Sequence, residues 1–331
     1  MDEAARIALL RHLFEAEAPG IDVGIGDDAA VLAPVDGSCH RLVWTIDEQV
    51  EAVHFRRDLL SWHDLGWRSL MAAASDVAAM GAVPWCALSA MVLPSDVDDA
   101  ALEQIGLGQR DAGRILSAPV VGGNLARGGA LSIATTVLGT CERPVQRSGA
   151  RVGDGLWLAG KLGIARAGLE ALLRAEPEGA ALAPALAAWR TPRALIAEGC
   201  AMAPCAHAAI DVSDGLACDV GHIAQASGVA IVLDEEALLA DSTLCEAARA
   251  LRESALDLAL FGGEDYALVA ASCVDVPGFR CIGTVRAGSG LVMRGPTGER
   301  AIEPIGFDHF RVKPGVTDRR PEASRSSGDR G

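Results

Sequence analysis

The sequence is poor in lysine, and this scarcity excludes the commonest way of binding nucleotide phosphates. Among its 331 residues only Lys161 and Lys313 are lysine, so almost all of the 29 basic residues are arginine. A P-loop requires the pattern G-x-x-x-x-G-K-[ST], and neither lysine lies in one. No G-x-G-x-x-G turn follows a predicted strand either. If the chain handles phosphates, it does so by another route than a phosphate-binding lysine.

Long apolar runs, paired cysteines and positive net charge are also missing. Apolar stretches such as 71–74 and 133–139 are far shorter than the roughly 20 residues that span a bilayer, and the acidic segment 1–6 lacks a signal-peptide core. The nine cysteines form no C-x-x-C pair, which indicates reduced thiols rather than a zinc site or disulfides. A formal net charge of −15 repels nucleic acid. We therefore expect a cytoplasmic protein that binds neither membranes nor nucleic acids.

The chain does contain enough apolar material for two packed domains. Half of its residues are apolar and 22% are charged, which is a globular composition, and its length is that of two domains. Strand-like and helical segments alternate, which predicts an α/β fold. We place an N-terminal domain at 1–143, a C-terminal α/β domain at 144–312 and a disordered, charged tail at 313–331.

Hydrophobic periodicity and turn residues predict the individual elements. Helices are expected at 3–17, 65–80 and 164–173, with Gly81 as the left-handed cap of the second. Two more are expected to begin at the acidic segment 96–99 and at 189–193. Another is expected to run through Ile223, with Ser213 or Asp214 as its N-cap. Strands are expected at 85–93, 118–123, 131–140, 155–159, 208–212, 229–233, 266–271 and 281–285, and extended, turn-rich pieces at 24–32, 41–45 and 50–55.

Acidic residues beside glycine or other small residues recur at the ends of apolar segments. These segments are Gly26-Asp27-Asp28-Ala29, Thr45-Ile46-Asp47, Ser75-Asp76, Asp211-Val212-Ser213-Asp214-Gly215 and Gly262-Gly263-Glu264-Asp265. A carboxylate there can approach a hydrated cation without burying an uncompensated charge. Hard oxygen ligands of this kind suit Mg²⁺, which is usually shared with substrate phosphates. Each segment alone is also ordinary turn chemistry, but together they predict a magnesium-dependent enzyme acting on phosphates.

Three further features are weaker signals. Gly122-Gly123-Asn124 is either a loop whose amides approach a phosphate or an ordinary turn between strands. Arg147 is either a forked phosphate clamp or an inert surface arginine. His54 is, on its own, more typical of a structural histidine. A G-x-S-x-G elbow and an activated cysteine are both absent, so covalent nucleophilic catalysis is not indicated.

Taken in chain order, these and neighbouring segments resemble the thiamine-monophosphate kinase family of the aminoimidazole-ribonucleotide-synthetase-like superfamily. The resemblance covers about residues 20–310 and is carried by the segments 24–30, 45–47, 53–55, 75–82, 147–150, 211–216, 262–266 and 306–310. It implies an ATP-dependent, direct in-line transfer of a phosphoryl group to thiamine monophosphate, assisted by several magnesium ions. It also implies an α/β (α+β) fold of two halves, the first pairing with a second copy into a homodimer whose strands close a β-barrel.

The resemblance further implies roles for individual residues. Magnesium ligands would be Asp28, Thr45, Asp47, Asp76, Asn124, Asp211 and Asp214, supported by Asp27; ATP would contact Gly123, Asn124, Arg147 and Ser213; and thiamine monophosphate would contact His54, Glu264 and Phe307. No general base is implied, because the attacking phosphate oxygen is already anionic. Two departures affect one metal position: Asn124 replaces a frequent aspartate, and Ile46 replaces a hydroxyl residue.

Two other functions stay open. One is a sister enzyme that forms aminoimidazole ribonucleotide or selenophosphate, although the latter calls for a reactive cysteine near the N-terminus and the first cysteine here is Cys39. The other is a non-catalytic thiamine-phosphate or nucleotide binder whose metal cluster has decayed at Ile46 and Asn124.

Overall fold

The computed structural model describes residues 20–24, 26–34, 39–176 and 179–307. All of them belong to one compact unit, 15–307. The predicted helix 3–17, the predicted tail 313–331 and the last three residues of the segment 306–310 lie outside the described residues. No helix in the described ranges has the length and apolarity to cross a membrane.

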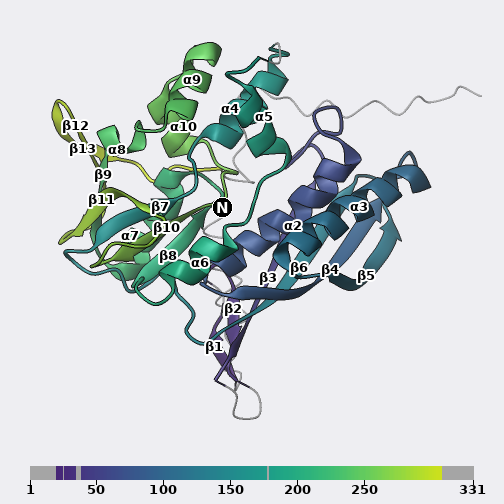
Figure 1. The fold of residues 1–331 in the computed structure, drawn as a ribbon, viewed down its shortest axis with the longest axis horizontal. Coiled ribbons are helices and arrows are strands. Elements are labelled where there is room, and N and C mark those ends of the chain that lie inside the picture. The colour runs from purple at the N-terminus through teal and green to yellow at the C-terminus, as the bar shows by residue number, and fades with distance from the viewer. Residues whose placement is uncertain (1–19, 25, 35–38, 177–178, 308–331) are drawn as a thin grey trace, which may run out of the picture. The chain divides into compact units, whose positions relative to one another are not determined.

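The first sheet has six strands in the order β1-β2-β3-β6-β4-β5. Its strands are β1 (Ile21–Val23), β2 (Ala30–Leu32), β3 (Arg41–Val50), β4 (Val83–Leu93), β5 (Val120–Arg127) and β6 (Ser132–Cys141). Only β4 and β5 pair in parallel; the other neighbours are antiparallel. Buried and less buried residues alternate along β6, as they do when one face of a sheet is covered. Helices α2 (Trp62–Ala79) and α3 (Asp99–Leu116) cover that face (Figure 1).

Helix α2 begins and ends at clear local signals and is held tightly against α3. Ser61 and Asp64 form a capping box at its start, and Gly81, with φ +68°, follows its C-cap. A side chain at Gly66 or Gly108 would place its Cβ 2.0 Å from a backbone oxygen of the other helix. The two backbones therefore touch, which fixes the position of α2 and of every side chain that it carries.

The second sheet has seven strands in the order β13-β12-β9-β11-β7-β10-β8. Its strands are β7 (Gly155–Ala159), β8 (Ala208–Val212), β9 (Ala230–Asp234), β10 (Ala267–Ser272), β11 (Arg280–Arg286), β12 (Gly290–Gly295) and β13 (Gly298–Ile302). The accompanying helices are α4 (Ile164–Leu173), α5 (Ala183–Arg190), α6 (Ile196–Met202), α7 (Leu216–Ser227), α8 (Glu235–Leu238), α9 (Ser242–Leu251) and α10 (Ala255–Phe261). Every residue of β8 and β10 is buried, which explains their continuous apolar sequences.

Most predicted elements are confirmed, and β7, α4 and β8 match to the residue. Two predictions are wrong. Residues 189–193 do not open a helix: Trp189 and Arg190 end α5, because the residue before Pro192 is disfavoured in helical geometry. Neither Ser213 nor Asp214 is the N-cap of α7. That cap is Gly215, with φ +115°, and it makes no side-chain capping bond.

Candidate active site

Three carboxylates from distant parts of the chain meet between the two sheets. Asp28 precedes β2, Asp76 lies near the end of α2, and Asp211 lies on β8. One oxygen of each lies within 4.8 Å of the others. Two hydroxyl groups orient the cluster: Thr45 on β3 donates to Asp76 at 2.5 Å, and Ser75 donates to Asp211 at 2.6 Å.

The cluster is electrostatically strained as it stands. Burial raises the pKa of Asp76 well above its ordinary value, and the charges of Asp211 and Asp28 raise it further. Burial and then the charge of Asp28 raise the pKa of Asp211 to about 7. The pKa of Asp27 is raised to about 6, again mainly by burial and next by Asp28. Three carboxylates at this separation repel each other unless protons or cations lie among them.

A hard cation such as Mg²⁺ fits this donor set. Asp28 has one carboxylate oxygen, Oδ2, that is buried without a hydrogen-bond partner among the described residues. An ionised oxygen in that condition costs several kcal/mol unless something positive faces it. The surrounding donors are carboxylate oxygens and the hydroxyl of Thr45, without sulfur or nitrogen ligands, which is the chemistry that magnesium prefers.

The other two predicted acidic ligands lie at the edge of the cluster. The charge of Asp47 raises the pKa of Asp76, and that of Asp214 raises the pKa of Asp211. Burial raises the pKa of Asp47 itself. The five aspartates of the predicted metal site therefore gather in one place, although their roles as ligands stay predictions.

Asn124 and Gly123 lie apart from this cluster. In the sheet register Asp47 faces Thr135, Thr135 faces Ser89, and Ser89 faces Gly123 on the edge strand β5. Three strand spacings amount to roughly 14 Å. A side chain at Gly123 would place its Cβ 1.7 Å from the Ser89 carbonyl oxygen, so only glycine fits there. Within one chain, Asn124 is thus separated from the aspartates with which the resemblance grouped it as a magnesium ligand.

Arg147 touches the acidic cluster directly. Its guanidinium donates to Asp28 Oδ1 through Nη2 at 2.6 Å and Nε at 3.0 Å, and its backbone N–H donates to both oxygens of Asp27, at 3.2 and 3.3 Å. Its side chain keeps 25% of its surface exposed. Arg147 is therefore a cation at the rim of the cluster, with donors left for an anionic ligand.

Asp219 organises the turn between β8 and α7. Its Oδ2 accepts the backbone N–H groups of Ser213, Asp214 and Gly215 at 3.1, 3.1 and 3.2 Å. These bonds satisfy the backbone N–H groups that a Ser213 or Asp214 cap was predicted to serve. Asp219 was not predicted, although an acid in the first turn of a helix that follows a glycine is a signal for such a role.

The three residues predicted to contact thiamine monophosphate lie in three different segments. His54, in the turn after β3, accepts the Val50 N–H at Nδ1 (2.9 Å). Glu264, in the loop before β10, bonds to the buried Arg68 and to Trp189. Phe307 is exposed, and its N–H donates to the Asp214 carbonyl oxygen at 3.2 Å. Phe307 therefore lies beside the acidic cluster. Arg68 and Trp189 were not foreseen.

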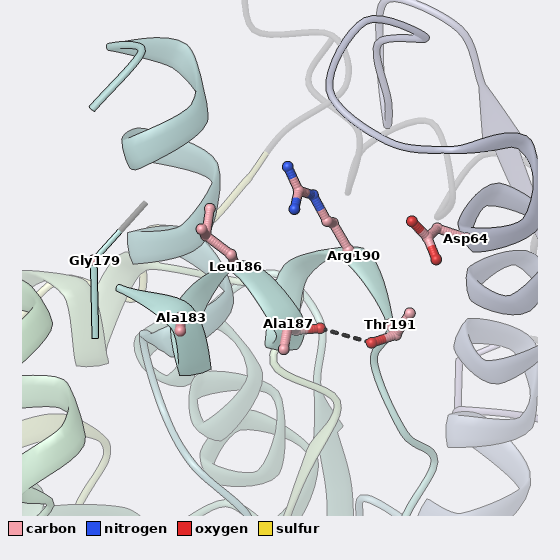
Figure 2. Close-up of a pocket in the computed structure, with 7 residues that line it drawn as sticks. All are labelled: Asp64, Gly179, Ala183, Leu186, Ala187, Arg190 and Thr191. Carbon is pink, nitrogen blue, oxygen red and sulfur yellow. Dashed lines mark hydrogen bonds between the residues drawn. The ribbon is translucent and has the colours of Figure 1, made fainter. Parts of the chain in front are cut away.

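A pocket of about 440 Å³ opens between α2 and α5. Figure 2 shows Asp64 on α2 across from Arg190 and Thr191 at the end of α5, where Thr191 donates to the Ala187 carbonyl oxygen. None of the predicted site residues lines it. The pocket is therefore separate from the cluster of Asp28, Asp76 and Asp211.

Comparison with known proteins places these features in a family. Residues 26–141 match the model of AIR synthase related protein, N-terminal domain. The thiamine-monophosphate kinase of Aquifex aeolicus is 35% identical over 94% of this chain and 98% of its own length, and that of Mycobacterium tuberculosis is 37% identical over 82% and 81%.

Solved structures agree in fold as well as in sequence. AaThiL complexed with AMPPCP and TMP aligns with a TM-score of 0.85 at 32% identity, covering 93% of this chain and 97% of that one. The thiamine-monophosphate kinase of Stenotrophomonas maltophilia aligns with a TM-score of 0.72 at 32% identity, covering 88% and 95%. The α/β fold expected from the resemblance is confirmed, and the chain belongs to the thiamine-monophosphate kinase family.

Proposed function

We propose that this protein transfers the γ-phosphoryl group of ATP directly to thiamine monophosphate, giving thiamine diphosphate and ADP. The observation that carries the proposal is the meeting of Asp28, Asp76 and Asp211 around a buried, unpartnered carboxylate oxygen. A relative that is 35% identical over nearly the whole chain bears the name of that activity, and a solved neighbour holds AMPPCP and TMP.

The residues suit a transfer between two polyanions. Bound Mg²⁺ would neutralise phosphate charge; Asp28, Asp47, Asp76, Asp211 and Asp214 would hold it, with the hydroxyl of Thr45 beside them and Asp27 in support. Arg147 is placed to donate to a phosphate at the rim of the cluster, as expected for an ATP contact. Ser213, the second proposed ATP contact, lies two residues after Asp211, and its backbone N–H is held by the Asp219 carboxylate. The acceptor phosphate is already anionic, so alignment and charge neutralisation supply the catalysis and no side chain acts as a base.

The deciding experiment combines purified protein with ATP, Mg²⁺ and thiamine monophosphate. Formation of thiamine diphosphate, dependent on Mg²⁺, is the expected result. Binding of both ligands without turnover would instead indicate a non-catalytic binder. Turnover of ATP with another acceptor, and none with thiamine monophosphate, would indicate a sister enzyme.

ATP is abundant in the cytoplasm, and all nine cysteines are free in the structure, so we place the enzyme in the cytoplasm.

We also propose a homodimer formed through the first sheet. The face opposite α2 and α3 carries large exposed apolar side chains: Trp44, Ile46, Val83, Trp85, Leu88 and Val121. Trp44 is 51% and Trp85 is 60% exposed. An apolar sheet face of this kind is typical of a surface that a partner covers.

Replacing Trp85 by aspartate is expected to convert a dimer into a monomer, because it buries a charge in the apolar contact. Light scattering after size-exclusion chromatography measures the mass. Val274→Asp, at an exposed position after β10, is the matched control and should leave the mass unchanged. A wild-type protein with the mass of one chain would rule out the dimer.

A further inference from the structure

Arg68 is a fully buried cation at the junction of three segments. From α2, its Nε donates to Gln49 Oε1 at 3.3 Å, its Nη1 donates to the Trp189 carbonyl oxygen, and its Nη2 donates to Glu264. The guanidinium carbon also lies 5.0 Å from the centroid of a Trp189 ring. A cation with no exposed surface requires such compensation, and Glu264 is the carboxylate that supplies it.

The two side chains of the Arg68–Glu264 ion pair differ in exposure, and only the carboxylate is accessible to solvent. The side chain of Arg68 is 0% exposed, whereas that of Glu264 is 26% exposed. Arg68 holds one oxygen of Glu264, and Trp189 Nε1 holds the other at 2.9 Å. Two donors thus fix the carboxylate plane, while each oxygen keeps a lone pair for a ligand.

The backbone that presents Glu264 is strained. Gly263, Glu264 and Tyr266 all have positive φ, at +76°, +59° and +48°. Non-glycine residues are unfavourable in that region and persist where the surroundings over-determine them, often at ligand clamps. Here the Glu264 N–H donates to the Ser213 carbonyl oxygen at 2.7 Å, and the Asp265 side chain accepts the Gly163 N–H at 2.6 Å.

Helix α2 links this pair to the acidic cluster. Arg68 and Asp76 are eight residues apart on one helix, which corresponds to about 12 Å. The charges of Arg68 and Glu264 both act on Asp47, so the pair borders the proposed metal site. One helix therefore carries both Asp76, a carboxylate of the proposed Mg²⁺ site, and Arg68, which holds the Glu264 carboxylate.

We propose that Arg68 is a positioning residue for the substrate: with Trp189, it aims the Glu264 carboxylate at the positively charged ring of thiamine monophosphate. The inference rests on the proposed function and extends it. The Arg68–Glu264 pair selects an acceptor that carries a fixed positive charge at a set distance from its phosphate. Arg68 acts through Glu264 and does not itself touch the substrate.

Steady-state kinetics of three variants tests this role. Arg68→Lys keeps the charge but loses the forked donor set. Trp189→Phe keeps a ring but loses the N–H. The double variant Arg68→Met/Glu264→Gln replaces the ion pair by neutral groups of similar volume, which buried pairs tolerate. We expect the KM for thiamine monophosphate to rise about tenfold or more in the first and third, and about threefold in the second. The KM for ATP should stay within about twofold of wild type.

A purely structural ion pair would behave differently. If the double variant melts at the wild-type temperature and keeps the wild-type KM for thiamine monophosphate, the positioning role is wrong. Equal rises in the KM for ATP and for thiamine monophosphate would also overturn it. If the wild-type enzyme does not phosphorylate thiamine monophosphate at all, the proposed function itself fails, and that result is independent of the variants.

Discussion

Asp76→Asn is expected to lower turnover by about a thousandfold or more, a rise of about 4 kcal/mol in the barrier. The substitution keeps the shape of the side chain and an oxygen that can accept the Thr45 hydroxyl. It removes a negative charge from the centre of the proposed metal site, where transition-state charge must be neutralised. Asp47→Ala should abolish turnover for the same reason. Initial rates at saturating ATP and Mg²⁺ measure the effect.

The same change should stabilise the metal-free protein, which separates loss of a ligand from misfolding. Asp76 has a pKa well above its ordinary value because of burial and of the Asp211 and Asp28 charges. Its ionisation therefore opposes folding near neutral pH, and a neutral amide removes that cost. Urea unfolding in the presence of EDTA measures the change in the free energy of unfolding. Asp275→Asn, at an exposed position, is the control. Turnover within about threefold of wild type would contradict the metal role of Asp76.

The affinity for Mg²⁺ is expected to fall about tenfold from pH 8 to pH 6, because protons and the cation compete for the same oxygens. Asp211, with its pKa raised to about 7 by burial and by Asp28, takes up a proton over this range. Asp27, at about 6, begins to do so at the acid end. Isothermal titration calorimetry with Mg²⁺ at pH 8 and at pH 6 gives the ratio of the two affinities.

The stability of the metal-free protein should move in the opposite direction. Since the folded pKa of Asp211 lies above the unfolded value of 3.8, the folded state binds more protons, and this group's contribution is lost as pH rises from about 4 through 7. Mg²⁺ restores the stability of the folded protein, because it binds the folded state and not the unfolded one. The increase in Tm on adding Mg²⁺ should thus be larger at pH 8 than at pH 6. An equal increase at both values would show that the cluster does not bind the cation.

Local sequence determined much of the secondary structure and the chemistry of the site. The apolar runs of β7 and β8 and the left-handed glycine that follows α2 depend on neighbours in the chain, so periodicity and turn residues predicted them. The same holds for the acid-and-glycine segments around Asp28, Asp47 and Asp211, whose residue types alone indicate oxygen ligands for a hard cation. At the turn before α7 the prediction was wrong, because the side chain that accepts the backbone N–H groups is Asp219, four to six residues further along the chain, rather than Ser213 or Asp214.

Only the tertiary structure decided which of these groups meet. Asp76 and Asp211 are 135 positions apart, and their approach depends on how α2 packs between the two sheets, bringing Ser75 within 2.6 Å of Asp211. The same packing buries Arg68 against Glu264 and leaves Asn124 on an edge strand. Such contacts depend on the joint fit of several elements, and neither periodicity nor spacing along the chain encodes that fit in any single segment.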